Sequence, residues 1–337
     1  MSSEINLSSQ GGGAIDSAID IVYLWVDGAD PAWSARRRAA LHARPADLAR
    51  YGDVAGRYRD NGELRFNLRA LQRFFPGHGH VYLVTDDQVP AWLRPQAGLT
   101  VINHRDLLPA AALPVFDSGH IESWLHHIPG LSERYFYLND DIFFGAPVLV
   151  ADWFGDSAVG AAPRLAVYRD DGAPSEPAGL EPEATALVNA AALSRQWLAR
   201  RYPDYRHVPA LFAHAPRPML KSALQALETA APELFALVRS TVFRTWSAPP
   251  LVPDLLPRWL LRHGQAALRP DNGGALYLCS GAADAEAQFA ALSGGFGQIP
   301  FFCLNDTSDD AAADDPQLRR IGATLRALLP QPSRFER

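Results

Sequence analysis

The sequence predicts an α/β protein built around a mainly parallel sheet. Short apolar runs of strand length recur along the chain, and segments of about 10–15 residues with helical character lie between them. Strands that alternate with helices in this way form β-α-β units, in which helices cover both faces of the sheet. The composition agrees, because 48% hydrophobic and 20% charged residues are ordinary for a globular chain. For 337 residues we expect one large domain or two closely packed ones.

The first strand and the first clear helix have distinct boundaries. Residues 19–26 form a near-continuous apolar and aromatic run, which predicts a buried strand that ends in the turn sequence at 27–31. Apolar residues at helical spacing predict a helix over 61–75. Pro76 and Gly77 follow directly and should stop that helix.

Four further apolar runs predict the other strands. They lie at 80–85, 101–102, 135–138 and 299–304. A helix-like segment at 118–127 leads into the third of these runs.

The chain divides by composition into three parts. Residues 1–17 are rich in Ser and Gly and predict a disordered leader. Residues 18–165 contain the alternation of strands and helices. Residues 166–337 combine a Pro- and Gly-rich loop at 170–185, a mainly helical stretch at 186–270 and a C-terminal piece that completes the domain.

Charge and motif content argue against several classes of protein. With 31 basic and 37 acidic residues the net charge is −6, which disfavours binding to nucleic acid. Cys279 and Cys303 are the only cysteines, too few for a disulfide framework or a four-cysteine zinc site and typical of a reducing cytosol. No apolar run approaches the roughly 20 residues needed to span a bilayer, so we expect a soluble, cytoplasmic protein. The G-x-x-x-x-G-K-[ST] loop and the G-x-G-x-x-G fingerprint are also missing, which argues against P-loop ATPases and dinucleotide enzymes.

Acidic and amide side chains follow four of the predicted strands where each one ends. The pairs are Asp27 and Asp30, Asp86 and Asp87, Asp140 and Asp141, and Asn305 and Asp306. The carboxyl ends of parallel strands meet at one edge of a sheet, so these side chains could converge on a single cleft. The alternative at each position taken singly is that Asp and Asn are common turn formers and helix N-caps.

Asp140 and Asp141 are the strongest candidates for a functional pair. They stand directly between the apolar run at 135–138 and a second apolar run at 142–144. Burying two adjacent carboxylates is costly unless a cation or a hydrogen-bond donor compensates. A divalent metal would do so, and Mg²⁺ commonly holds substrate phosphates through one or two carboxylates.

A phosphate-bearing substrate would also need cations and donors. The candidate arginines are Arg57, Arg59, Arg65, Arg69, Arg217, Arg239 and Arg244. His214 precedes a helix that we expect to begin near Pro218, and its imidazole could act as an acid or base or bind a phosphate. The alternative for His214 is a packed or capping side chain, and for most arginines a solvated surface charge.

These motifs together resemble the Stealth family of sugar-phosphate transferases. The similar segments are 19–31 for the first conserved block, 57–69, 80–93 and 118–145 for the second, 214–218 for the third and 302–306 for the fourth. All four blocks occur in the order of the family. The family includes bacterial capsule polymerases and the animal N-acetylglucosamine-1-phosphotransferase, which makes the mannose-6-phosphate lysosomal tag.

The resemblance implies a fold, a reaction and its partners. The fold would be Rossmann-like and GT-A-like, with a nucleotide sugar bound by residues 18–165. The reaction would transfer a hexose-1-phosphate, usually from a UDP-sugar, to an acceptor hydroxyl and release UMP, in capsular or exopolysaccharide synthesis. The expected cofactor is Mg²⁺ or another divalent cation, and the expected partners are the nucleotide-sugar donor and a saccharide or other hydroxyl acceptor. Such an enzyme would work at the inner face of the cell membrane, with room for peripheral association with a capsule-assembly complex and for oligomers.

The expected site contains three groups of residues. The catalytic group is Asp141, His214, Arg65, Arg217 and Arg244. The substrate-binding group is Asp27, Gly28, Asp30, Asn61, Glu63, Asp86, His120, Glu122 and Asn139. The metal ligands are Asp140, Asp141, Asn305 and Asp306. In this scheme Asp27 lies against the donor nucleotide, Gly28 lets the backbone approach it closely, and Asp141 competes with His214 as the base.

Two other functions remain open at this point. A metal-dependent glycosyltransferase would use the same Asp-Asp motif but would release UDP and form a glycoside. A binding module would keep the cleft for a saccharide and lack turnover. That module would require loss of key acids, yet Asp27, Asp140, Asp141 and Asp306 are all present.

Overall fold

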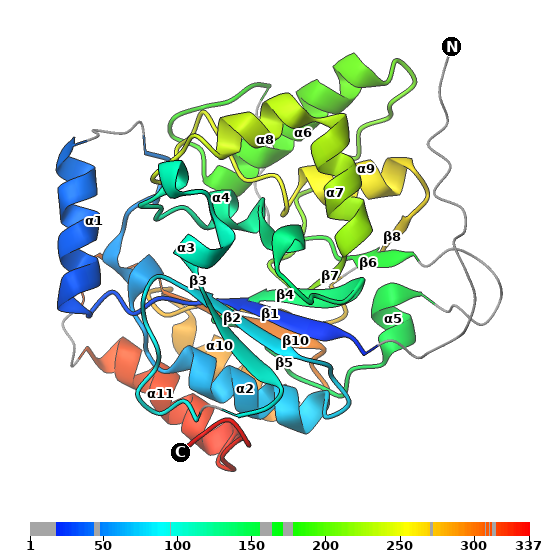
Figure 1. Cartoon of the computed structure of the whole chain (residues 1–337). Helices are drawn as coiled ribbons and strands as arrows, with labels where there is room; N and C mark the ends of the chain where they lie inside the picture. Colours follow the sequence, from blue (N-terminus) through cyan, green and yellow to red (C-terminus); the bar gives the residue numbers. More distant parts are fainter. Residues whose placement is uncertain are drawn as a thin grey trace.

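The centre of the molecule is a five-stranded sheet in the order β3-β2-β1-β4-β7 (Figure 1). The computed structural model describes residues 18–43, 48–94, 96–155, 164–170, 178–269, 272–306, 308–309, 311 and 315–337. The strands are β1 (Asp20–Leu24), β2 (Val81–Thr85), β3 (Leu99–Asn103), β4 (Arg134–Asn139) and β7 (Arg217–Leu220). The first four run parallel, and β7 runs antiparallel to β4 at one edge. The predicted α/β fold with a mostly parallel, Rossmann-like and GT-A-like sheet is confirmed.

Helices lie against both faces of this sheet (Figure 1). On one side are α2 (Glu63–Phe74), α10 (Ala285–Gly295) and α11 (Pro316–Leu328). On the other are α3 (His104–Leu107), α4 (Ser118–Glu122), α6 (Ala186–Arg201), α7 (Lys221–Ala230), α8 (Pro232–Val238) and α9 (Leu255–Arg262). The remaining helices are α1 (Pro31–Ala43) and α5 (Val150–Phe154), with short 3₁₀ turns η1 (Ala55–Tyr58), η2 (Ala110–Ala112) and η3 (Leu125–His127).

Two smaller sheets complete the fold. The first has the order β5 (Ile142–Phe144), β10 (Phe301–Asn305), β9 (Leu276–Cys279), and the second pairs β6 (Leu165–Val167) with β8 (Ala266–Leu268). β10 runs antiparallel to β5, and the rings of Phe143 and Phe302 stack with centroids 4.8 Å apart. This pairing brings the C-terminal part of the chain against the turn between β4 and β5.

Burial explains why the strands read as continuous apolar runs. All residues of β1 and β2 are buried, and Val22 of β1 lies in register between Tyr82 and Tyr137 of its neighbours. A strand covered on both faces needs apolar side chains on both, so the alternation typical of half-exposed strands disappears. The runs at 19–26, 80–85, 101–102, 135–138 and 299–304 correspond to β1, β2, β3, β4 and β10, as predicted.

The structure corrects the sequence prediction around Pro218. The expected helix is wrong there, because Arg217–Leu220 form β7 and α7 begins only at Lys221. Pro218 lies opposite Phe136 on an edge strand, where a residue without an N–H is tolerated. The helix expected at 118–127 is also different, since α4 and η3 are two short separate turns.

The three parts predicted from composition are not separate units in space. The boundary at residue 165 falls inside β6, and residues after it supply β7 to the main sheet and β10 to the sheet that begins with β5. The stretch 186–270 contains the helices α6, α7, α8 and α9, together with β7 and β8. The expected leader at 1–17 and residues 171–177 of the expected loop lie outside the described residues. Within the described part of the chain, no helix has the length and apolar character needed to cross a membrane.

Candidate active site

A cleft of about 750 Å³ opens at the carboxyl ends of β1, β4 and β10. Residues 24–26, 139–142 and 304–306 at these strand ends line it. Its charged and titratable lining is Arg50, Arg57, Arg59, Glu63, His104, Glu122, Asp140, Asp141, Asp170, His214, Arg217, Arg244 and Asp306. The volume lies in the range of small-molecule and cofactor sites, about 300–1,000 Å³. The cleft therefore has both the position and the size expected of a ligand site in an open α/β sheet.

A buried asparagine holds the turn that presents Asp140 and Asp141. The Asn67 side chain on α2 donates hydrogen bonds to the backbone oxygens of Asp140, at 2.9 Å, and Ile142, at 2.6 Å. The Tyr23 hydroxyl on β1 donates to Asn67 Oδ1 at 2.9 Å. Asn67 is fully buried, so this chain of bonds ties the central strand, the helix and the acidic turn together. We infer that Asn67 positions the acidic pair, a role that the sequence analysis missed.

Acidic neighbours surround Asp140 on this side of the cleft. Burial raises the pKa of Asp140 well above its ordinary value, and Asp141, Glu63 and Asp60 raise it further. Burial also raises the pKa of Glu63 to about 8, against the opposing effect of hydrogen bonds from Asn61. These shifts mean that the acids repel one another across a poorly solvated region.

Asp141 has one oxygen engaged and one available. Its Oδ2 accepts a weak hydrogen bond from the Cys303 thiol at 3.3 Å. Its Oδ1 is buried and finds no hydrogen-bond donor among the described residues. An orphaned carboxylate oxygen beside an uncompensated acid fits a site for a cation with oxygen ligands.

Asp306 differs from Asp140 and Asp141 because its charge is already compensated. Its Oδ2 accepts from Arg59, with which it forms a salt bridge, and its Oδ1 accepts from the backbone and hydroxyl of Ser308. Asn305, which precedes it, also lines the cleft. The structure thus brings all four expected metal ligands to the lining of one cleft, and of the three aspartates only Asp306 forms a salt bridge with an arginine among the described residues.

Arg57 and Arg244 are two of the five described arginines that line the same cleft. Burial lowers the pKa of Arg57, and the neighbouring Arg244 lowers it further. Arg244 donates to the Ser118 hydroxyl, and its Nε lies 3.7 Å from an oxygen of Asp117. Asp117 and Tyr58 act in the opposite direction on the pKa of Arg57. Two guanidinium groups beside one carboxylate keep a net positive charge, which favours a bound anion.

Arg217 and Glu122 form the third part of the charged lining. Burial lowers the pKa of Arg217, and Glu122 and Tyr137 act in the opposite direction. Burial raises the pKa of Glu122, whose Oε1 lies 2.8 Å from the Tyr137 hydroxyl. The same hydroxyl is 2.5 Å from Asn139 Oδ1, so it can donate to either group. Asn139, Glu122 and Arg217 are therefore neighbours in the cleft, as the sequence analysis expected.

His214 lies next to the acidic pair. Its Nε2 is 3.7 Å from Asp141 Oδ1, and both side chains are 23% exposed. The exposed ring of Tyr277 on β9 lies edge-on to it, with centroids 6.4 Å apart. An imidazole at this distance from a carboxylate can accept a proton from a bound hydroxyl and be stabilised in its charged form. Tyr277 also lines the cleft, and no sequence signal marked it.

The structure does not bring Arg65 to the cleft. Its Nε forms a salt bridge of 2.5 Å with Glu336, close to the C-terminus. The reason is geometric: residues two apart on a helix point to nearly opposite sides, and Asn67 faces inward. Glu63, four residues before Asn67, shares the inward face and does line the cleft.

Asp27, Gly28 and Asp30 do not line the cleft either. The Asp27 carboxylate accepts from the backbone of Ala29 at 2.8 Å, and the Asp30 carboxylate accepts from the backbone of Trp33 at 2.7 Å at the start of α1. Gly28 lets the backbone pack closely against Tyr58 and not against a ligand. A Cβ at this position would lie 2.6 Å from the Tyr58 carbonyl oxygen. The alternative stated for strand-end acids, that they form turns and caps, holds for Asp27 and Asp30.

Three further expected substrate contacts have structural partners instead. Asp86 forms a salt bridge of 2.9 Å with Arg36. His120 is fully buried, its Nδ1 lies 2.8 Å from the Thr241 carbonyl oxygen, and burial lowers its pKa. Asn61 does not line the cleft, but its backbone and side chain hold both oxygens of Glu63, at 2.6 and 2.9 Å.

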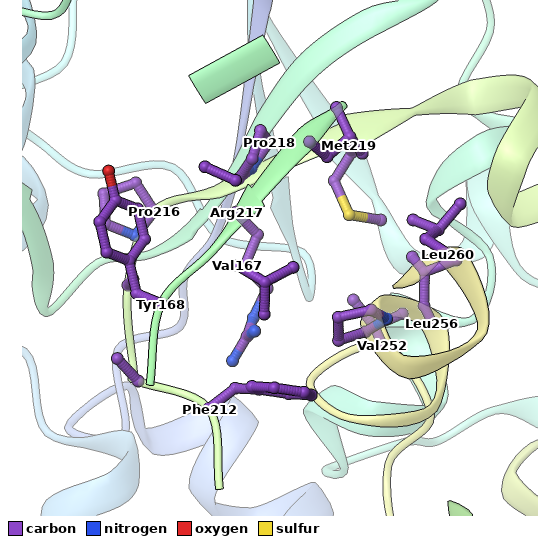
Figure 2. Close-up of a pocket in the computed structure, with 15 residues that line it drawn as sticks. Val167, Tyr168, Phe212, Pro216, Arg217, Pro218, Met219, Val252, Leu256 and Leu260 are labelled. Carbon is purple, nitrogen blue, oxygen red and sulfur yellow. The ribbon is translucent and has the colours of Figure 1, made fainter. Parts of the chain in front are cut away.

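A second, much smaller pocket lies behind Arg217 (Figure 2). It has a volume of about 40 Å³, and its labelled lining is mostly apolar, with Val167, Phe212 and Met219 among the side chains. A space of this size holds a water molecule or two and no sugar. The larger cleft is therefore the candidate active site.

Comparison with known proteins identifies the family. Three family models match: Stealth protein conserved region 1 over residues 18–44, conserved region 2 over 57–161 and conserved region 4 over 299–337. The chain belongs to the Stealth family. Conserved region 2 of this Stealth protein contains Arg57, Glu63 and the Asp140–Asp141 pair, and conserved region 4 contains Asp306. The reading of 214–218 as the third block stays a prediction.

Curated proteins similar to this Stealth chain include several named exopolysaccharide phosphotransferases. One from Streptomyces coelicolor is 35% identical over 324 residues, which cover 95% of this chain and 33% of the relative. CpsY of Mycobacterium tuberculosis is 30% identical over 326 residues, 95% of this chain and 58% of the relative. A protein of Nocardia farcinica is 30% identical over 322 residues, which cover 95% of this chain and 61% of the relative. The chain thus spans between 33% and 61% of the length of these relatives.

Proposed function

We propose that this protein transfers a hexose-1-phosphate from a nucleotide sugar, most simply a UDP-sugar, to an acceptor hydroxyl in exopolysaccharide or capsule synthesis. The observation that carries the proposal is that one cleft is lined both by the Asp140–Asp141 pair and by the arginines Arg57, Arg217 and Arg244. A diphosphate bound to a metal ion has the complementary charges, because the cation suits the acids and the phosphates suit the arginines. The names of the similar proteins support the same reaction class, since they are exopolysaccharide phosphotransferases.

Each part of the cleft has a role in this reaction. The acceptor oxygen attacks the phosphorus that bears the sugar, the bond from that phosphorus to the bridging oxygen breaks, and UMP leaves with the bridging oxygen. His214 takes the proton of the acceptor hydroxyl, with Asp141 Oδ1 at 3.7 Å to stabilise the resulting imidazolium. Arg57, Arg244 and Arg217 hold the phosphate oxygens, whose charge must be stabilised in the transition state.

The acidic pair suits a divalent cation. Asp140 and Asp141 would hold Mg²⁺, which when bound neutralises part of the diphosphate charge. Asp306, paired with Arg59, would orient that arginine toward the site and bind metal less directly. We place the reaction in the cytoplasm, at the inner face of the cell membrane, where a lipid- or polymer-linked acceptor is accessible.

The identity of the released nucleotide tests the proposal. Purified protein is incubated with a panel of UDP-, GDP- and CDP-sugars plus Mg²⁺ and a saccharide acceptor, and nucleoside mono- and diphosphates are separated. The proposal expects UMP from at least one UDP-sugar, a phosphodiester in the product, and no release in EDTA. Release of UDP with a glycoside product would instead establish the metal-dependent glycosyltransferase.

A further inference from the structure

Three side chains of different chemistry meet at the edge of the cleft. Asp141 offers a carboxylate oxygen, His214 an imidazole nitrogen and Cys303 a sulfur, and these atoms all lie within 4.8 Å of one another. We propose that these three side chains form a binding site for a soft divalent ion, Zn²⁺, that shares Asp141 with the magnesium site and so excludes magnesium there.

The separations are close to those of a tetrahedral zinc centre. Zinc binds sulfur at about 2.3 Å and nitrogen or oxygen at about 2.0–2.2 Å, which places neighbouring ligand atoms roughly 3.3–3.7 Å apart. Cys303 Sγ lies 3.3 Å from Asp141 Oδ2, and His214 Nε2 lies 3.7 Å from the other oxygen, Asp141 Oδ1. The Asp141 carboxylate thus lies between the sulfur and the imidazole, and one atom from each of the three side chains lies within 4.8 Å of the others.

The protein holds two of the three ligands rigidly. Cys303 is buried in β10, the middle strand of its sheet, in register with Ile142 on one side and Tyr277 on the other. The backbone N–H of Leu304 donates to the Asp141 carbonyl oxygen at 3.0 Å, which joins the residue after Cys303 to Asp141 itself. Only the His214 ring needs to adjust, and its loop is held through Ala213, whose N–H donates to the Tyr168 oxygen at 2.9 Å.

One of these ligand atoms lacks a partner that would satisfy it otherwise. Asp141 Oδ1, which lies 3.7 Å from His214 Nε2, is a buried atom without a hydrogen-bond partner in the part of the chain that the structure describes. Asp141 and His214 line the open cleft, so an ion can reach them and water can complete its coordination. A thiolate and an imidazole select zinc over magnesium, which prefers oxygen ligands alone.

A second group of potential ligands in the fold lacks these features. His126, His127 and Glu228 also lie within ligand distance of one another. However, Arg239 already forms a salt bridge with Glu228, and its guanidinium would repel a metal ion. That group contains no sulfur, so the two sites can be told apart by spectroscopy.

Zinc binding removes the thiol proton to solvent and engages both Asp141 and His214. If the proposed function is correct, zinc at micromolar concentration inhibits transfer in competition with Mg²⁺. This consequence rests on the proposed function, whereas the binding itself does not.

Cobalt spectroscopy tests the site without an activity assay. The metal-stripped full chain is titrated with Co²⁺, and the near-ultraviolet absorption of a thiolate–cobalt bond is followed before Zn²⁺ is added in competition. We expect a thiolate–cobalt absorption band that saturates at one equivalent of Co²⁺. Added Zn²⁺ should displace the cobalt and abolish the band. We expect Cys303→Ser to abolish the band and to weaken zinc binding about tenfold or more. Cys279→Ser is the matched control, because Cys279 is the only other cysteine and lies on the adjacent strand, opposite Asn305. It should keep the full band.

A second variant keeps the test valid if Cys303→Ser does not fold. His214→Ala leaves the thiol and the sheet intact, and we expect it to weaken cobalt and zinc binding about tenfold or more. The proposal is overturned if wild-type protein shows no thiolate band at saturating cobalt, if Cys279→Ser removes the band, or if His214→Ala binds zinc normally. If zinc binds as expected but UMP is never released from any UDP-sugar, the proposed function fails and the zinc site stands.

Discussion

Two clusters of charged residues in this molecule show opposite behaviour. Near the C-terminus, Glu336 accepts hydrogen bonds from Arg65 and Arg69, and its side chain is only 1% exposed. Burial alone would raise its pKa, but these bonds and one from the Ser333 backbone outweigh burial and lower the pKa to about 2. In the cleft, burial raises the pKa of Asp140 and neighbouring acids add to the effect.

The contrast separates structural charges from functional ones. In the Glu336 cluster both arginines face the carboxylate and join α2 to the end of the chain, so its charges stabilise the fold. The cleft also contains opposite-charge pairs, but it places Asp140 beside other acids and Arg57 beside Arg244, which costs folding free energy that a bound ligand would offset. Sequence motifs cannot make this distinction, because both clusters consist of the same residue types.

The largest effect is expected from Asp141→Asn. The substitution keeps the shape of the side chain and removes the charge beside His214 and the proposed metal. We expect UMP release to fall by more than about 100-fold, as for other losses of preorganised charge in active sites. The matched control is Asp152→Asn, an exposed aspartate on α5, which should retain activity. Normal turnover in Asp141→Asn with an unchanged magnesium requirement would remove Asp141 from the site.

Arg57→Ala should reduce activity without reducing stability. The Arg57 Nε is buried and without a hydrogen-bond partner among the described residues, and Arg244 repels the group. Removing the guanidinium relieves that repulsion and also removes its contacts with Tyr58 and Asp117, so we expect a melting temperature close to that of wild type together with about a 100-fold loss of kcat/KM. Calorimetric melting and steady-state kinetics measure the two quantities. A lower melting temperature with normal kinetics would assign Arg57 to the fold.

Glu336→Gln should show the reverse pattern. Because the pKa of Glu336 in the folded state lies below its ordinary value of 4.5, ionisation stabilises the fold above that pH, and the contribution is lost as pH falls from about 4.5 to about 2. We expect the variant to lose about 2 kcal/mol of unfolding free energy at pH 7 and to lose less stability than wild type in that acid range. Urea unfolding at several pH values measures this. Glu286→Gln, at an exposed glutamate of α10, is the control and should be neutral. Unchanged stability with impaired UMP release in Glu336→Gln would contradict the structural role.

Asp27→Ala should have the smallest effect. Its carboxylate only caps the turn after β1, through the bond to Ala29. We expect a stability loss of about 1 kcal/mol and donor affinity within about twofold of wild type. Titration calorimetry with UDP measures the affinity, and a tenfold weakening would return Asp27 to the donor site.

Buried strands and the acids that directly follow them were predictable from the sequence. The apolar run before Asp140 placed that residue at a strand end, and the pairing of β4 with β1 brought it to the cleft. The rule failed for Asp27, which two residues separate from Leu24 at the end of β1, where the chain turns away to Tyr58. It also failed for Asp86, which directly follows β2 but is paired with Arg36. A position at a strand end therefore does not by itself decide whether an acid faces the ligand.

The direction of arginine side chains was not predictable from position alone. Arg57 lies in η1 and lines the cleft, whereas Arg65 projects from the outer side of α2. One signal was available: an asparagine on the apolar face of the helix marks the inward side, and Glu63 shares that side with Asn67 while Arg65 does not. The partner of Arg65, Glu336, is far away in sequence, so no local pattern could have revealed it.

The most direct test of the account compares UDP binding to Arg57→Ala and Arg65→Ala by titration calorimetry in the presence of Mg²⁺. We propose that Arg57, which lines the cleft, binds the diphosphate and that Arg65, which is paired with Glu336, does not. We therefore expect Arg57→Ala to weaken UDP binding about tenfold or more and Arg65→Ala to leave it within about twofold of wild type. Equal loss in both variants, or loss in Arg65→Ala alone, would contradict this assignment.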